Sequence, residues 1–316
     1  MMNLPILQRM VLAVLTLWLV SLLIFVATEL LPGDVASAIL GQNGTPETLA
    51  ALREQRGLNQ PALKRYLQWL YPMLHGDLGR SLTNGRPIAE DLLPRLGNSL
   101  FLAAYAAVIA IPLAVLLGIA SAVWRGTLFD RLTNGLTLLC ISVPEFFVGY
   151  LLVMFLSVRL AWFPSLSMVS PETGLSERLY HCTLPMLTLV LVVLAHMLRM
   201  TRASVGAVMS SSYIETAVLK GIVNWRIVLS HALPNALAPV INVIAFNLAY
   251  LVVGVILVEV VFVYPGVGQL MVDAVTKRDL PVVQACGLLF GGTYILLNTT
   301  ADLLAMWCNP RLRHGR

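Results

Sequence analysis

Charge is scarce in this sequence. Only 12% of the 316 residues are Asp, Glu, Lys or Arg, whereas soluble globular domains carry roughly 25%. Hydrophobic residues make up 58% of the chain and fall in long uncharged runs. Such runs are typical of membrane-spanning helices, because charged side chains are expensive in lipid. Composition by itself therefore indicates a multi-span membrane protein, and the net charge of +5 fits the bias that orients spans.

Motifs for nucleotide hydrolysis are also missing. The sequence has three lysines, Lys64, Lys220 and Lys277, and none of them completes the GxxxxGK[ST] loop whose backbone amides cradle phosphates. Gly266 and Gly268 are followed by no third glycine at the spacing of a dinucleotide loop. HExxH and GxSxG do not occur either, so hydrolytic chemistry has no motif support. We expect no enzyme activity in this chain, and any ATP hydrolysis must come from a partner.

Paired cysteines are absent as well. The four cysteines are Cys140, Cys182, Cys286 and Cys308, which lie far apart with no CxxC pair. This pattern gives no support to a disulfide framework or a zinc site. Three of the four fall in apolar runs, so we expect buried, inert thiols.

Six apolar segments come close to the roughly 20 residues that a helix needs to cross a bilayer. We expect spans at 10–31, 100–123, 132–158, 184–198, 237–263 and 282–307. The fourth is the weakest, because it is short and begins with Pro185. Pro112 and Pro144 fall inside the second and third spans, where neighbouring helices or water can satisfy the freed carbonyls. The fold class is therefore all-α and integral to the membrane.

The distribution of Lys and Arg predicts the orientation. If both termini are cytoplasmic, most basic residues of the short loops fall inside, as the positive-inside rule requires. The segment 32–98 then forms a long outer loop, and 199–235 forms the largest cytoplasmic loop. The outer loop should be structured: Thr45 can cap a helix that starts with Pro46 and ends near Gly57. A second helix is expected over 60–74, with leucines and Tyr66 on one apolar face that packs on the membrane core or on a partner.

Ionisable residues within or beside spans are functional candidates, because they are costly in lipid. The set comprises Glu29, Glu145, His196, Glu259 and Asp302. Glu145 follows Pro144, where a broken helix could line a cavity, and Glu259 lies near the outer end of the fifth span. We take Glu145 and Glu259 as the candidates for a translocation pathway or gate. A purely structural role remains open for each of them.

The most informative stretch lies in the cytoplasmic loop and begins with Glu215, Ala217 and Gly221. Nine residues follow Gly221, and the sequence then continues with His231, Ala232, Leu233 and Pro234. This stretch resembles the EAA loop of importer permeases, in which E-A-A, three residues, G and nine residues precede I-x-L-P. Thr216 and His231 depart from that pattern, and Ser211 and Ser212 replace an acidic pair found in many relatives. Tyr213 and the sequence around it resemble the peptide and nickel branch of these permeases.

The resemblance covers nearly the whole chain. Further matching pieces, in order, are Leu31–Asp34, Gly76–Ser81, Pro144–Phe146, Leu160–Pro164, Thr201–Ser204, Glu259–Gly268, Arg278–Gln284, Asp302–Leu304 and Asn309–Arg311. Each piece alone is weak, but their order and spacing together are specific. The resemblance implies a type I ATP-binding-cassette importer permease fold, with one transmembrane domain over 1–316 and a structured periplasmic loop after the first helix.

The resemblance also implies partners. A second homologous permease, two cytoplasmic ATPases that hold ATP and Mg, and an external substrate-binding protein would complete the importer in a bacterial inner membrane. The chain itself would bind no cofactor or metal and no nucleic acid. Tyr213, Glu215, Ala217, Gly221, Leu233 and Pro234 would form the ATPase-coupling loop.

Two physical features of that loop can be read directly. Ser212-x-x-Glu215 has the spacing of a capping box, and Gly221 permits a turn with positive φ. A capped helix and a coupling lever are compatible interpretations. The cargo stays open among peptides, nickel chelates, glutathione and sugars. A secondary transporter of small solutes is the alternative, although such proteins often show inverted repeats and this sequence has no clear repeat.

Overall fold

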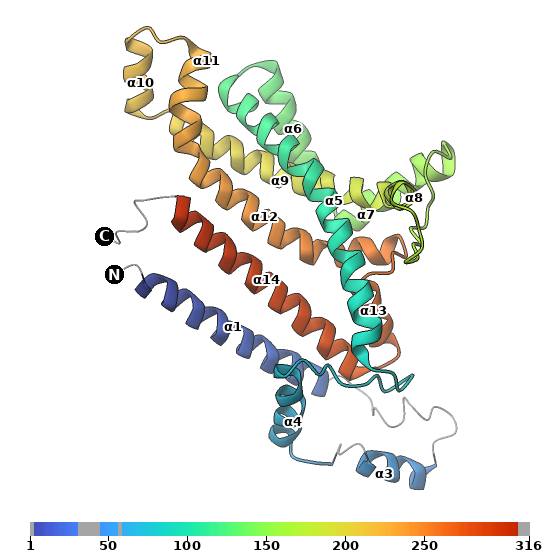
Figure 1. Ribbon diagram of the computed structural model, residues 1–316. Coiled ribbons are helices and arrows are strands. Elements are labelled where there is room, and N and C mark those ends of the chain that lie inside the picture. Colours follow the sequence, from blue (N-terminus) through green and yellow to red (C-terminus); the bar gives the residue numbers. More distant parts are fainter. Residues whose placement is uncertain (1–2, 31–44, 56–58, 309–316) are drawn as a thin grey trace.

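The computed structural model describes residues 3–30, 45–55 and 59–308 (Figure 1). Within these ranges the chain is almost entirely helical, and its only β-type pairing is an isolated bridge between Arg80 and Pro87. The helices are α1 (Asn3–Glu29), α3 (Pro46–Gln55), α4 (Ala62–Leu74), α5 (Ile88–Val123), α6 (Leu128–Ser142), α7 (Glu145–Leu152), α8 (Leu175–His181), α9 (Thr183–Met209), α10 (Ser212–Leu219), α11 (Asn224–Arg226), α12 (Leu233–Val261), α13 (Val267–Thr276) and α14 (Leu280–Cys308), with π-helical stretches η2 (Val153–Arg159) and η3 (Ile227–Ala232).

Four helices, namely α1, α5, α9 and α14, are long and apolar enough to cross a membrane. The number rises to six if each of two bent pairs crosses once. One pair is 128–142 with 145–159, bent by 102° at Val143–Pro144, and the other is 227–237 with 239–252, bent by 54°. The six apolar segments of the sequence thus correspond to four unbroken helices and two bent pairs.

Two helices extend beyond the apolar segments expected to span the membrane. The second span was expected to start at Leu100, but α5 already begins at Ile88 and continues through Pro94. The fourth was expected to be short, but α9 runs over 27 residues to Met209. Beyond the apolar runs, polar side chains of both helices have partners inside the protein, such as Asn98 of α5 with the Pro265 carbonyl oxygen and Arg202 of α9 with Asp130. The segments 32–98 and 199–235 therefore include helical residues of α5 and α9. Gly57 and the Leu31–Asp34 piece lie outside the described residues.

The core of the bundle forms around α9. Most of the central part of α9 is buried, and α5 and α12 pack against it. The face of α5 toward the core carries Ala103, Ala106, Ala107, Ala110 and Ala114, and small residues let helices in membranes approach closely. The approach is closest at Gly118, where an added Cβ would lie 2.7 Å from the Cβ of Thr201.

A second layer consists of α1 and α14, which lie side by side (Figure 1). Small residues again make the contact, since Ile24 lies over Gly287 and Val20 over Gly291. The start of α1, the end of α14 and helix α10 lie toward one end of the bundle, and α3, α4, α8 and α13 lie toward the other (Figure 1). We call these the α10 end and the α13 end.

The two helices expected in the long loop are present as α3 and α4. The side-chain oxygen of Thr45 accepts a hydrogen bond from the Thr48 amide at 3.3 Å, and Pro46 is the first helical residue. The expected cap and helix start are therefore confirmed.

Candidate functional site

Helix α10 is a short amphipathic helix at the α10 end. Ile214 and Ala217 form its buried face and pack against Ile227 and Ala232 from the segment that returns to the membrane. The helix therefore rests on the protein through apolar contacts, and its other face is open to solvent. Among the residues expected to form the coupling loop, Ala217 supports the helix from beneath and does not lie on the open face.

The expected capping box was wrong. Helix α10 starts at Ser212, its N-cap is Ser211, and no side chain caps the first turn. Glu215 is thus the fourth helical residue, one position too late to bond back to the N-cap. The Ser211 hydroxyl instead donates to the Val208 carbonyl oxygen at 2.7 Å. Glu215 lies exposed on the open face, so its carboxylate is available to a partner.

The expected turn at Gly221 is confirmed. Its φ is +74°, a conformation that costs little only for glycine. The Gly221 amide donates to the Val218 carbonyl oxygen at 2.9 Å, and the Ile222 amide donates to the Ala217 carbonyl oxygen at 3.2 Å. This pair of bonds is the Schellman arrangement, which ends a helix and reverses the chain. A Cβ at Gly221 would meet nothing within 4 Å, so the requirement for glycine there is purely conformational.

The open face of α10 and the turn after it carry large apolar side chains. Leu219 is 82% exposed, and Tyr213, Val218, Val223 and Trp225 are each more than half exposed. We call these five residues the apolar docking face. Exposed apolar side chains that gather on a surface are typical of interaction sites, so these five residues are candidates for contact with a partner. Leu233 and Pro234, in the first turn of α12, lie behind it, half-buried and exposed respectively.

Tyr213 also joins the two halves of the loop. Its hydroxyl lies 2.9 Å from Nδ1 of His231, and the two rings meet edge to face with centroids 5.8 Å apart. His231 belongs to η3, directly before α12. A residue that departs from the family pattern therefore connects helix α10 to the start of a bent membrane segment.

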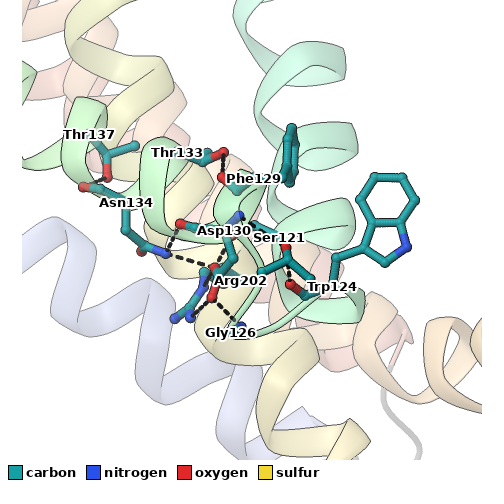
Figure 2. A network of polar contacts seen from close by, with 10 residues as sticks. Ser121, Trp124, Gly126, Phe129, Asp130, Thr133, Asn134, Thr137 and Arg202 are labelled. Carbon is teal, nitrogen blue, oxygen red and sulfur yellow. Dashed lines mark hydrogen bonds and ion pairs between the residues drawn. The ribbon is translucent and has the colours of Figure 1, made fainter.

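A buried ion pair lies close by, between α6 and α9 (Figure 2). Arg202 donates from Nε to one carboxylate oxygen of Asp130 at 2.7 Å and from Nη2 to the other at 2.9 Å. The same carboxylate accepts bonds from the Ser121 hydroxyl, the Gly126 amide and the Asn134 side chain. Five donors thus satisfy an Asp130 side chain that is only 6% exposed. The network fixes the ends of α5, α6 and α9, and α9 leads directly into α10.

Sequence reasoning singled out Thr201–Ser204 as a matching piece but missed Asp130 altogether. The available signal was an acidic residue near the edge of an apolar span, four residues after Gly126. Only the fold shows that Arg202 reaches it.

Glu145 lies at the start of α7, at the 102° bend of the third apolar segment. Its side chain is half-buried and accepts a hydrogen bond from the Tyr250 hydroxyl of α12 at 3.2 Å. Gly254 makes room for the carboxylate, since a Cβ there would come within 3.3 Å of it. The ring of His196 lies 6.1 Å from that of Tyr250. Three helices therefore bring polar groups together beside a broken span.

Glu259 is fully buried near the end of α12 and caps another helix. One carboxylate oxygen accepts from the Gly268 amide at 2.7 Å, and the other from the Ser99 hydroxyl at 2.5 Å. These contacts place hydrogen-bond acceptors at the N-terminus of α13, where the first amides have no partner within the helix. A Cβ at Gly266 would lie 2.1 Å from this carboxylate. The two glycines after the fifth span thus make space for Glu259.

Asp279 organises the loop at the α13 end. Its carboxylate accepts hydrogen bonds from the hydroxyls of Ser81 and Thr83 and from the amides of Leu82 and Thr83. It is 2% exposed. Two pieces of the resemblance, Gly76–Ser81 and Arg278–Gln284, therefore meet in space. No pattern along the chain indicates this pairing.

The remaining candidates have local roles or are not described. Glu29 pairs with Arg65 of α4 at 2.5 Å, and the side chain of Asp302 lies outside the described residues. Cys140, Cys182 and Cys286 are free. Cys182 and Cys286 are buried as expected, whereas Cys140 is only partly buried. Within the described ranges no group of three or more His, Cys, Asp or Glu side chains could hold a metal ion.

Comparisons with known proteins agree on one family. Residues 114–314 match the family model of the binding-protein-dependent transport system inner membrane component, and residues 1–103 match the model of its N-terminal part. A Brucella melitensis protein named as a peptide transport system permease is 36% identical over 314 residues, covering 99% of this chain and 100% of that protein. The glutathione transport system permease of Escherichia coli O6:H1 is 38% identical over 299 residues, covering 95% of each chain.

A solved structure supports the fold. A chain of the inward-facing MetNI methionine ABC transporter matches with a TM-score of 0.50 at 18% identity, covering 70% of this chain and 96% of that one. At that identity the match shows the shared type I importer permease architecture and nothing about cargo.

Proposed function

This chain belongs to the family of binding-protein-dependent transport system inner membrane components, and we propose that it couples ATP hydrolysis to peptide import through α10. It is the permease subunit of an ATP-binding-cassette importer, and ATPase activity belongs to partner subunits. Peptides are the proposed cargo, because the peptide permease relatives extend over its whole length. Glutathione, itself a tripeptide, falls in the same class.

The apolar docking face carries this proposal. Leu219 and its neighbours are exposed on a helix that the protein holds rigidly from behind, through Ile214 and Ala217. A cytoplasmic ATPase that covers this face would bury Tyr213 and Leu219 and meet the carboxylate of Glu215. The proposed coupling loop is therefore Tyr213, Glu215, Ala217, Gly221, Leu233 and Pro234, with Ala217 acting as support.

Force can pass from α10 into the membrane by two routes. The first runs through Tyr213 and His231 into the bent segment of η3 and α12. The second runs back along α9 to the ion pair between Arg202 and Asp130. Both routes consist of hydrogen-bonded or packed elements without a glycine-rich linker, so movement of α10 is transmitted and not absorbed.

The proposed pathway lies along Glu145. Its carboxylate is half-buried at the break between α6 and α7 and has one hydrogen-bond partner, Tyr250. A second homologous permease facing this side would complete the channel. Glu259 lies near the end of α12, the helix that also carries Tyr250. Because its carboxylate is fully buried, we propose that it acts indirectly, by holding the start of α13.

The assembly we propose contains this permease, a second similar permease, two cytoplasmic ATPases with ATP and Mg, and an external substrate-binding protein. The inner membrane is the proposed location, with both termini and α10 in the cytoplasm. The secondary-transporter alternative is not favoured, because the family relatives are permeases of ATP-driven systems.

The test reconstitutes the importer in proteoliposomes and measures uptake of a labelled dipeptide together with ATPase stimulation by loaded binding protein. Leu219→Ser removes an exposed side chain and should abolish stimulation while expression stays normal. Leu175→Ser, at a leucine that is 66% exposed on α8, is the matched control and should behave like wild type. Gly221→Val should also uncouple, because a β-branched residue at positive φ costs roughly 1–3 kcal/mol. Normal stimulation in both variants would contradict the docking role of α10.

A further inference from the structure

Helix α4 lies against the side of α1, well inside the end of that membrane helix. The Tyr66 hydroxyl is 2.8 Å from the Ser21 hydroxyl in a buried contact. Phe25 meets Tyr66 edge to face and also contacts Trp69. Ser21 lies eight residues before the last residue of α1, Glu29, and eight residues of α-helix rise about 12 Å. Since α1 is a span, Tyr66 contacts it at the depth of a lipid leaflet.

The surface of α4 divides into three stripes. The first faces the protein and carries Tyr66 and Trp69. The second is apolar and exposed, with Leu63 72% exposed, Leu67 55%, Tyr71 68% and Leu74 73%. The third is polar and exposed and carries Lys64, Gln68 and His75. Each polar residue follows a leucine of the apolar stripe, and one residue step turns a helix by about 100°. The two exposed stripes therefore lie side by side along the helix.

We propose that α4 is an interfacial helix whose leucine stripe, Leu63, Leu67 and Leu74, lies among lipid acyl chains in the leaflet at the α13 end. A helix with one apolar and one polar face lies in the plane of the interface, with its apolar face sunk into the acyl boundary. The polar stripe then faces the headgroups and water. In Figure 1, α4 lies beside the last turns of α1 and runs away from that helix at a steep angle.

Lipid fits the leucine stripe better than a protein partner does. The stripe continues the exposed apolar surface of α1, where Leu19 is 45% exposed and Leu23 is 60% exposed. A helix that spans the membrane exposes such residues to acyl chains, and α4 contacts it at the same depth. The ion pair between Glu29 and Arg65 lies at the end of α1, where a membrane–water interface is expected to hold charges.

This placement gives α4 a mechanical role. Met73, near the end of α4, packs in the apolar cluster of Ile88 and Val282, and the following loop is held by Asp279. A lipid-embedded α4 therefore fixes the height of that loop relative to the membrane surface. The inference concerns lipid contact and does not depend on the cargo or on coupling through α10.

Spin labels on single cysteines test the inference in the complete importer in native-composition vesicles. Leu67→Cys and Gln68→Cys form the matched pair, with Leu23→Cys, 60% exposed on α1 near the contact with α4, as the lipid standard. Oxygen should enhance the relaxation of the label at Leu67 as strongly as that of the lipid standard. The enhancement by a water-soluble nickel chelate should be at least fivefold smaller at Leu67 than at Gln68. Equal nickel accessibility at both positions would overturn the proposal. A strongly immobilised label at Leu67 that neither reagent reaches would also overturn it, in favour of a protein partner.

A second measurement leaves the native cysteines in place. Benzoylphenylalanine incorporated at Leu63 or Leu67 should cross-link to phospholipid on illumination, seen as a lipid-sized mass shift of the chain. Incorporation at Lys64 should give no such product. Cross-links from Leu63 and Leu67 to another subunit, without lipid adducts, would refute lipid contact. An inverted topology would leave these results unchanged and would show only as labelling of Gln68→Cys from the opposite side.

Discussion

The ion pair between Asp130 and Arg202 gives the sharpest stability prediction. Asp130→Ala removes an acceptor of five hydrogen bonds and leaves the Arg202 guanidinium, only 28% exposed, without its partner. Removing one member of a fully buried pair typically costs about 3–5 kcal/mol. Because 28% of the Arg202 side chain is exposed, we expect the lower end of that range, about 3 kcal/mol, for Asp130→Ala. Arg202→Ala should cost less, about 1.5–3 kcal/mol, since three donors still satisfy the carboxylate.

The assay is the free energy of unfolding of the purified permease, measured by titration with a denaturing detergent. The double variant completes a thermodynamic cycle, and contacting residues in one network couple by about 0.5–3 kcal/mol. For a bidentate, charge-assisted pair we expect the upper half of that range. Asp130→Asn keeps the shape but not the charge and should fall between wild type and Asp130→Ala.

The control is an exposed pair on α8. The Nε2 of His181 lies 3.9 Å from a carboxylate oxygen of Glu177, whose side chain is 65% exposed. Exposed pairs contribute about 0–1 kcal/mol, so Glu177→Ala should be nearly silent. A loss below about 1 kcal/mol for Asp130→Ala, or strict additivity in the cycle, would refute the reasoning that this network clamps α5, α6 and α9.

Four further predictions follow the same logic. Gly266→Ala places a Cβ 2.1 Å from a buried carboxylate and should cost about 1–3 kcal/mol, whereas Gly97→Ala, where a Cβ meets nothing within 4 Å, should be neutral or stabilising in the same titration. Asp279→Asn replaces an acceptor of four hydrogen bonds and should speed tryptic cleavage within 76–87; an unchanged cleavage rate would count against that role. Glu54→Cys should react with an impermeant thiol reagent from outside intact cells, and labelling only after the membrane is opened would contradict the orientation. The purified chain without partners should bind no ATP, and nucleotide binding at micromolar concentration would contradict that expectation.

The boundaries that the sequence misplaced share one cause. Hydropathy ends a span where charge begins, so Arg199 and Arg202 marked the end of the fourth span. Helix α9 continues to Met209, and within this continuation Arg202 has a partner on α6. That partner is 72 residues away along the chain, which no local pattern can indicate. The expected capping box at Glu215 was wrong by one residue, because α10 starts at Ser212 and its N-cap is Ser211.

Gly221 and Gly266 are glycines for different physical reasons. At Gly221 the sequence suggested positive φ, and the structure has it, because a helix end followed by a glycine is a local pattern. At Gly266 the sequence suggested at most a weak nucleotide loop. The reason for glycine there is the carboxylate of Glu259, folded back beneath it, and this is a tertiary contact.

The sequence by itself determined the helical membrane class, the apolar segments, the loop helices α3 and α4 and the family, because each depends on hydropathy or on local order along the chain. Tertiary structure alone decided which polar groups meet. It paired Asp130 with Arg202, Asp279 with the 81–83 loop, and Glu259 with the start of α13. The physical reason is that a polar group removed from water must find a partner. Which partner it finds depends on the packing of segments that are distant in sequence.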